Sequence, residues 1–209
     1  WARRPSRAAT GSAAAARAAA QALHERTGRS AGNGSLMRTA PVALAFLADS
    51  EGDEDAAAEA ARAISSLTHW HDDAGDACVL WTLAIRHAVL TGFLDARIGL
   101  PALPAARRER WAALLDDAEQ RQPRDFERNG WVVEALQGAW SSIHGAMAAH
   151  ADGAALRDGT ALVDGLERAV RGGRDTDTVA AIAGGLLGAA FGASAVPAAW
   201  RRVLHGHPG

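Results

Sequence analysis

The chain contains, at residues 172–192, the stretch GGRDTDTVAAIAGGLLGAAFG. Two carboxylates and two hydroxyls occupy consecutive positions before an apolar run of small residues, namely Asp175, Thr176, Asp177 and Thr178. The length and composition of that run predict a buried helix with the acidic motif at its start. Like charges so close together repel each other unless a cation lies between them. Since Mg²⁺ and Mn²⁺ prefer oxygen ligands, the motif indicates a metal site. Helix capping is the alternative interpretation.

The spacing of apolar residues predicts helices along the rest of the chain. Period 3.6 dominates and period 2 is almost absent, which predicts an all-α fold. With 209 residues, 48% of them hydrophobic, the chain suits one compact domain over residues 1–209. The expected helices cover residues 13–25, 41–48, 53–67, 73–90, 105–121, 132–147, 164–170 and 179–191.

Two of these helices carry further expectations. The segment 73–90 is apolar on nearly all sides, so it should be central, and Asp72 should cap its N-terminus. Glycines interrupt the segment 179–191 repeatedly, and close approach of neighbouring helices is the expected reason.

Composition excludes several classes of protein. The formal net charge of −2 argues against a nucleic-acid binder or a polybasic membrane protein. No apolar run is long enough, without glycine or charge, for a membrane helix. The single cysteine, Cys78, rules out an internal disulfide and fits a reducing, cytoplasmic compartment. It lies in an apolar helical pattern, so we expect it to be buried.

A second stretch has the composition of an anion-binding loop. Residues 32–41 read GNGSLMRTAP, in which a Gly-x-Gly-Ser turn precedes a helix start. Free backbone N–H groups, a hydroxyl and a nearby guanidinium are the parts of a cradle for phosphate or pyrophosphate. An ordinary tight turn explains the same residues, because Asn and Gly readily adopt positive φ.

A third stretch, SSLTHWHDD at residues 65–73, holds two histidines and two aspartates. His69 and His71 are two positions apart at a junction between helices, and no further His or Cys lies at a familiar zinc spacing. A histidine that faces a ligand is therefore the better interpretation.

These stretches, in this order, resemble the ADP-ribosylglycohydrolase family, which includes the dinitrogenase-reductase-activating glycohydrolases. The resemblance covers residues 32 to 200, about four positions in five of the chain. Its motifs are GNGSLMR at 32–38, TH at 68–69 with DAC at 76–78, GWVVEAL at 130–136 and GRDTDT at 173–178. It implies a compact orthogonal all-α bundle with two Mg²⁺ or Mn²⁺ ions in a cleft.

The resemblance also implies an activity. Family members hydrolyse the glycosidic bond between ADP-ribose and an acceptor, so the partner would be an ADP-ribosylated protein or a small ADP-ribosylated substrate. Matched by position, the metal ligands would be Asp175, Asp177 and Thr178. The residues along the ADP-ribose would be Gly34, Ser35, Met37 and His69.

One part of the family pattern is missing from this sequence. A Gly-Asp-Ala-type motif and a Thr-Asp-Asp-Thr-type motif supply the other metal ligands and the acid that acts on water. Neither occurs here, so the catalytic acid is unassigned and the chain is expected to begin partway into the fold. A non-catalytic ADP-ribose or nucleotide-binding module, or an inactive fragment, is the alternative function. A purely structural helical scaffold is a further one.

Overall fold

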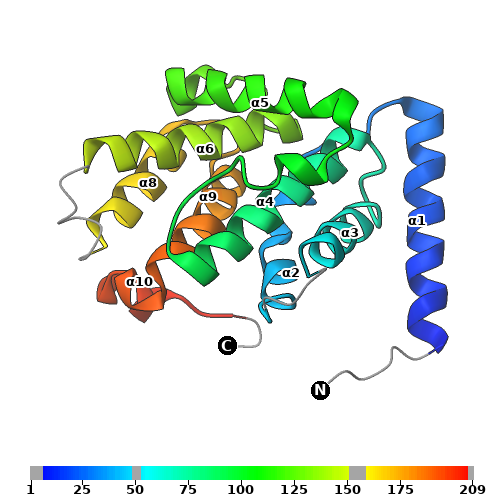
Figure 1. The fold of residues 1–209 in the computed structure, drawn as a ribbon, viewed down its shortest axis with the longest axis horizontal. Coiled ribbons are helices and arrows are strands. Elements are labelled where there is room, and N and C mark those ends of the chain that lie inside the picture. Colours follow the sequence, from blue (N-terminus) through cyan, green and yellow to red (C-terminus); the bar gives the residue numbers. More distant parts are fainter. Residues whose placement is uncertain (1–6, 49–52, 151–158, 207–209) are drawn as a thin grey trace.

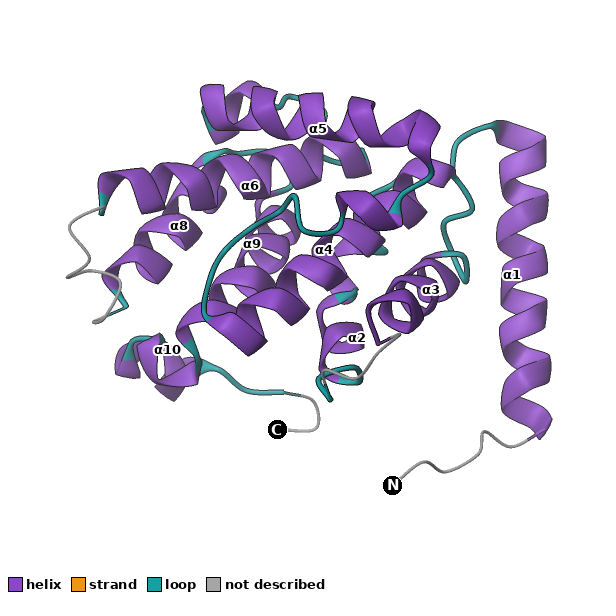
Figure 2. Cartoon of the chain, in the orientation of Figure 1, coloured by secondary structure: helices purple, strands orange, loops and turns teal. Residues whose placement is uncertain are grey.

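The computed structural model describes residues 7–48, 53–150 and 159–206. These residues form α-helices joined by loops and short 3₁₀ turns, as Figure 2 shows. Within these ranges the one β-type contact is an isolated antiparallel bridge between Gly32 and Trp131. The predicted all-α fold is confirmed. None of the helices described is long and apolar enough to cross a membrane.

The helices differ from the predicted ones mainly at their ends. Those of the described ranges are α1 (Arg7–Thr27), α2 (Ala40–Leu44), α3 (Asp53–Ser65), α4 (Asp72–Thr91), α5 (Ala105–Gln120), α6 (Val132–Ala149), α8 (Thr160–Arg171), α9 (Thr176–Phe191) and α10 (Ala198–Val203). Helix α10 was not predicted, because its six residues are too short for a periodic signal.

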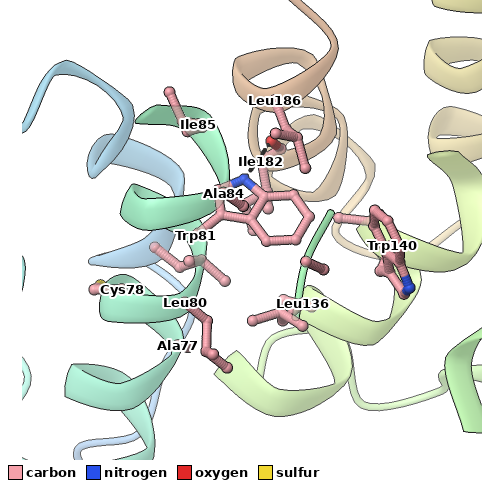
Figure 3. Packing of buried hydrophobic residues seen from close by; sticks show 14 of the residues in the cluster. Ala77, Cys78, Leu80, Trp81, Ala84, Ile85, Leu136, Trp140, Ile182 and Leu186 are labelled. Atoms are coloured by element: carbon pink, nitrogen blue, oxygen red, sulfur yellow. Dashed lines mark hydrogen bonds between the residues drawn. The ribbon is translucent and has the colours of Figure 1, made fainter. Parts of the chain in front are cut away.

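Helix α4 lies at the centre of the fold, as the sequence predicts. Every residue from 73 to 86 is buried, and the helix packs against α2, α3, α6 and α9. Figure 3 shows how it meets α9: the indole Nε1 of Trp81 donates a hydrogen bond to the carbonyl oxygen of Ile182 at 2.9 Å. This bond satisfies the only polar atom of a fully buried side chain. Helix α1, in contrast, stands at the edge of the molecule beside α3 (Figure 1).

The cap of α4 differs from the prediction. His71, not Asp72, is the N-cap residue, and its Nδ1 accepts a hydrogen bond from the Asp73 amide at 3.1 Å. Asp72 lies inside the first turn, where its carboxylate pairs with Arg107. An imidazole nitrogen therefore does here what a short polar side chain usually does at this position.

The glycines of α9 only partly serve close packing. A Cβ on Gly184 would lie 3.2 Å from Leu166, and one on Gly185 would lie 3.2 Å from the Cβ of Ala40, so α8 and α2 approach closely there. A Cβ on Gly188 would meet no atom within 4 Å of the described structure. The close-packing prediction is therefore wrong for Gly188. Gly192 ends the helix with φ +75°.

Candidate functional site

Three loops that are far apart in the sequence meet at the start of α9. The glycine loop (residues 31–38) first joins the loop that precedes α6. The Asn33 amide donates to the carbonyl of Gly130 at 3.1 Å, and the Val132 amide donates to the carbonyl of Ala31 at 2.9 Å. These bonds flank the Gly32–Trp131 bridge. The two loops are therefore fixed in register, like a two-residue piece of sheet.

Two asparagine side chains connect this pair of loops to the acidic motif. Asn33 Nδ2 donates to Asp175 Oδ2 at 2.6 Å and to the carbonyl of Asn129 at 2.7 Å. Asn129 Oδ1 accepts from the Asp175 amide at 3.2 Å, and its Nδ2 donates to the carbonyl of Gly173 at 3.0 Å. Both side chains are buried. The position of the Asp175 carboxylate is thus set by residues from two other loops.

The turn before α9 has an uncommon backbone. Gly173 has φ +82° and Arg174 has φ +62°, so two successive residues lie in the left-handed region. A residue with a Cβ pays a steric cost there. Arg174 is held by hydrogen bonding to the carbonyl of Arg124 at 3.1 Å and by an ion pair with Glu127 at 3.3 Å. The turn places Asp175 directly before the first turn of α9.

The three predicted metal ligands occupy this first turn. Asp175 is half-buried, Asp177 is exposed and Thr178 is buried. Burial alone would raise the pKa of Asp175, but hydrogen bonds from Asn33 and Thr178 outweigh it and hold the pKa below its ordinary range. The carboxylate is therefore ionised at neutral pH.

Helix capping accounts for part of this arrangement only. Asp175 is the N-cap residue of α9, yet no side-chain capping bond of ordinary geometry forms. Its closest hydrogen-bonding partner is instead Asn33, from another loop. Both carboxylates still benefit from the positive end of the helix dipole.

The donor chemistry of the turn fits a hard cation. Asp175, Asp177 and Thr178 offer oxygen atoms only, and Mg²⁺ is commonly held by one or two carboxylates with water completing its shell. Among the described residues no group of three or more His, Cys, Asp or Glu side chains surrounds a common point. These three residues could therefore hold one ion with several waters, and the binuclear centre remains an expectation.

The glycine loop has one buried and one open side. The Ser35 side chain is 0% exposed, and its hydroxyl oxygen accepts hydrogen bonds from Ser65 at 3.0 Å and from Cys78 at 3.5 Å. Burial raises the pKa of the Cys78 thiol, which confirms a buried structural cysteine. Within the described structure the amides of Gly34 and Ser35 have no hydrogen-bond acceptor. Gly34 is half-buried, so its amide can donate to a ligand, whereas Ser35 is fully buried.

Met37, the third residue of this loop in the predicted site, is 46% exposed. Its sulfur accepts a hydrogen bond from the Thr178 hydroxyl at 3.7 Å. The loop therefore contacts the acidic turn at a second point, in addition to the bond from Asn33.

His69 lies against the same loop. A Cβ on Gly32 or on Gly34 would come within 3.2 Å of the imidazole ring, so both glycines leave room for it. Its Nδ1 is 2.7 Å from the hydroxyl of Thr68, to which Arg38 donates a hydrogen bond. Burial and, after it, the nearby Arg38 cation lower the pKa of His69, so the ring is neutral at pH 7.

The other motif residues of this region have different positions. His71 caps α4 and packs edge-on against His24, with ring centroids 5.7 Å apart. Of the two histidines in residues 65–73, His69 therefore contacts the glycine loop and His71 the start of α4. Asp76 is fully buried in an ion cluster with Arg62 at 2.8 Å and Arg107 at 2.7 Å. Asp76 therefore supports the fold and not the loop junction.

Sequence reasoning missed the two asparagines as connecting residues. The sequence indicates a turn at Asn33 and a loop at Asn129. An Asn-Gly pair predicts a turn, which is true of both positions. No local pattern indicates that the side chains bond residues 142 and 46 positions away.

Comparison with known proteins identifies the family. The family model of ADP-ribosylglycohydrolase matches residues 1–208. The chain belongs to the ADP-ribosylglycohydrolase family. The match extends beyond the residues 32–200 on which the sequence resemblance rests. An ADP-ribosylarginine hydrolase of Pseudomonas putida is 29% identical over 170 residues, which are 81% of this chain and 41% of that protein. The chain thus spans less than half the length of this relative. No solved structure matches.

Proposed function

We propose that this chain carries the ADP-ribose-binding and metal-binding site of a hydrolase that cleaves the bond between ADP-ribose and an acceptor. The observation that supports this most is the hydrogen bond from Asn33 in the glycine loop to Asp175 in the acidic turn. It joins a loop suited to a diphosphate to a turn suited to a cation. Such a pairing is what a ligand with a pyrophosphate next to a ribose requires.

The glycine loop would bind the diphosphate. The free amide of half-buried Gly34 can donate to a phosphate oxygen, and a backbone donor of this kind suits an anion. Because Ser35 is fully buried, its contribution is through the shape of the loop. Exposed Met37 offers an apolar contact to the ligand.

The acidic turn would hold Mg²⁺ or Mn²⁺ through Asp175, Asp177 and Thr178. When bound, such an ion orients ribose hydroxyls and lowers the pKa of a coordinated water. Asn33 bonds Oδ2 of Asp175 and would set how the carboxylate faces the ion. Cleavage of a glycosidic bond passes through an oxocarbenium-like state, which the ionised Asp175 would stabilise.

His69 would contact a ribose as a neutral ring. Its lowered pKa means that it adds no positive charge beside a developing oxocarbenium ion. Its imidazole is held by the Thr68 hydroxyl and packs closely against Gly32 and Gly34. This makes it a positioning group for the sugar.

The first substrate to test is ADP-ribosylarginine, because a relative's name states that it acts on this bond. The assay measures release of ADP-ribose by the wild-type chain with Mn²⁺, with Mg²⁺ and with chelator. We expect metal-dependent release that Asp175→Asn and Asp177→Asn reduce at least tenfold each, whereas Asp116→Asn on α5 leaves it unchanged.

A non-catalytic binding module is the second candidate. It is favoured by the small ligand set, in which only two carboxylates lie on the acidic turn and Asp177 is exposed. Saturable binding of ADP-ribose without any release from ADP-ribosylarginine would support this second function. Absence of both binding and release would contradict each of the two.

A further inference from the structure

Asn129 makes three hydrogen bonds that meet around the acidic turn. Its side-chain Oδ1 accepts from the Asp175 amide and its Nδ2 donates to the Gly173 carbonyl. Its backbone carbonyl accepts from the Asn33 side chain, which also bonds the Asp175 carboxylate. The residue is only 4% exposed, so these bonds form away from solvent. No other side chain in the described structure bonds both sides of the turn.

The two bonded backbone groups lie on either side of Arg174. This residue has φ +62°, a conformation that a side chain with a Cβ resists. The side chain of Asn129 therefore bonds the backbone on both sides of Arg174. Without it, the turn would relax toward ordinary φ, and Asp175 would move relative to Asn33.

We propose that Asn129 is a positioning residue for the metal ligands, an inference that rests on the function proposed above. It holds the Gly173–Asp175 turn in its left-handed form and, through Asn33, sets the orientation of the Asp175 carboxylate. It touches neither the substrate nor the ion. Groups that orient metal ligands in this way usually contribute about 10- to 100-fold to metal affinity.

The test measures Mn²⁺ affinity directly, by the electron paramagnetic resonance signal of free Mn²⁺ in titrations of the whole chain. Asn129→Ala should weaken Mn²⁺ binding about 10- to 100-fold. The matched control is Gln137→Ala, because Gln137 is also a buried amide and bonds only the carbonyl of Leu114 and the carboxylate of Asp117. It should lower thermal stability without changing the Mn²⁺ dissociation constant.

A second substitution separates positioning from general loss of structure. Glycine adopts positive φ without steric cost, so Arg174→Gly should make the turn less dependent on Asn129. In the Asn129→Ala background it should recover about fivefold of the lost Mn²⁺ affinity. If Asn129→Ala does not fold, the isosteric Asn129→Asp replaces it, since a carboxylate cannot donate to the Gly173 carbonyl.

Two results would overturn the inference. If Asn129→Ala affects Mn²⁺ binding no more than Gln137→Ala while Asp175→Asn abolishes it, the metal site stands and Asn129 does not position it. If the wild type and Asp175→Asn bind Mn²⁺ equally, the proposed metal site is itself wrong, and the role of Asn129 falls with it.

Discussion

At the scale of single residues, the contact between the His69 ring and the glycines Gly32 and Gly34 is tightly constrained. The imidazole approaches so closely that a Cβ on Gly34 would lie 3.2 Å from its Cε1 atom. The neighbouring glycine Gly130 also takes part in the loop junction, yet a Cβ there would meet no described atom within 4 Å. The two glycines therefore make a matched pair for testing whether the position of His69 matters for binding.

We predict that Gly34→Ala weakens ADP-ribose binding and Gly130→Ala does not. The added methyl group must displace the His69 ring, and crowding of this kind costs about 1 kcal/mol or more. If this cost falls entirely on the ligand-bound state, the affinity for ADP-ribose decreases about fivefold. Isothermal titration calorimetry measures both variants. Equal affinities would show that the ring does not face the ligand.

The pKa of His69 predicts a pH dependence of stability. Because the folded protein lowers this pKa below the ordinary value of about 6.5, the unfolded chain binds the proton first as pH falls. Stability contributed by the neutral ring is present above pH 6.5 and is lost as pH falls toward the folded pKa.

His69→Gln should therefore lose less stability than the wild type between pH 7.5 and pH 5. Chemical unfolding at the two pH values measures the difference. A His87→Gln variant is the control, because His87 lies on α4 away from the glycine loop. The same pH dependence in wild type and His69→Gln would show that the ring is not held neutral.

At the scale of elements, α9 combines two uses of glycine. At Gly185 a Cβ would lie 3.2 Å from the Cβ of Ala40, which is tighter than an ordinary contact, and 3.6 Å from Ile85, which is an ordinary one, so the approach of α2 depends on its absence. At Gly188 nothing described is within 4 Å, and that position lines a groove of about 330 Å³ between α2, α4 and α9. The helix is thus closely packed on one part of its surface and open on the next.

We predict that Gly188→Ala stabilises the chain and Gly185→Ala does not. Alanine is favoured over glycine inside a helix by about 1 kcal/mol, which raises Tm by about 2–4 °C for a domain of this size. At Gly185 the contact with α2 cancels this gain. Thermal unfolding of the two variants measures it. Destabilisation by Gly188→Ala would mean that another segment occupies the groove.

The sequence predicts helices best where apolar residues recur at regular helical spacing over a long segment. Helices α4, α5 and α6 begin and end within about three residues of their predicted bounds, because long periodic segments give a strong signal. Helix α8 begins earlier than expected at Thr160, and α2 ends earlier at Leu44.

The candidate site was predictable only in part. The acidic turn and the glycine loop are each continuous in the sequence, so their chemistry can be inferred from their residue types. Their junction depends on bonds between Asn33, Asn129 and Asp175, whose partners are 96 and 142 positions apart. Only the packed fold brings such residues together.

At the scale of the whole molecule, a buried ion cluster connects three helices. Asp76 on α4 is fully buried and pairs with Arg62 on α3 at 2.8 Å and with Arg107 on α5 at 2.7 Å. The indole Nε1 of Trp111 also donates to it at 3.2 Å. A buried carboxylate is tolerated only when paired in this way, so the cluster fixes how α3, α4 and α5 are assembled.

We predict that Asp76→Asn destabilises the chain by about 3 kcal/mol or more, because two arginines lose their common partner. Asp116→Asn, whose carboxylate is exposed and pairs with Arg97, should cost less than about 1 kcal/mol. Urea unfolding measures both. A small effect of Asp76→Asn would mean that solvent or neighbouring acids compensate the arginines.

We propose that the glycine loop and the acidic turn form one metal-dependent site for ADP-ribose. Calorimetric titration of ADP-ribose into the chain with Mn²⁺, with chelator, and into Asp175→Asn with Mn²⁺ tests it most directly. We expect saturable binding with Mn²⁺ that weakens at least tenfold on chelation and in the variant. Equal affinity under all three conditions, or no binding to the wild type, would contradict the account.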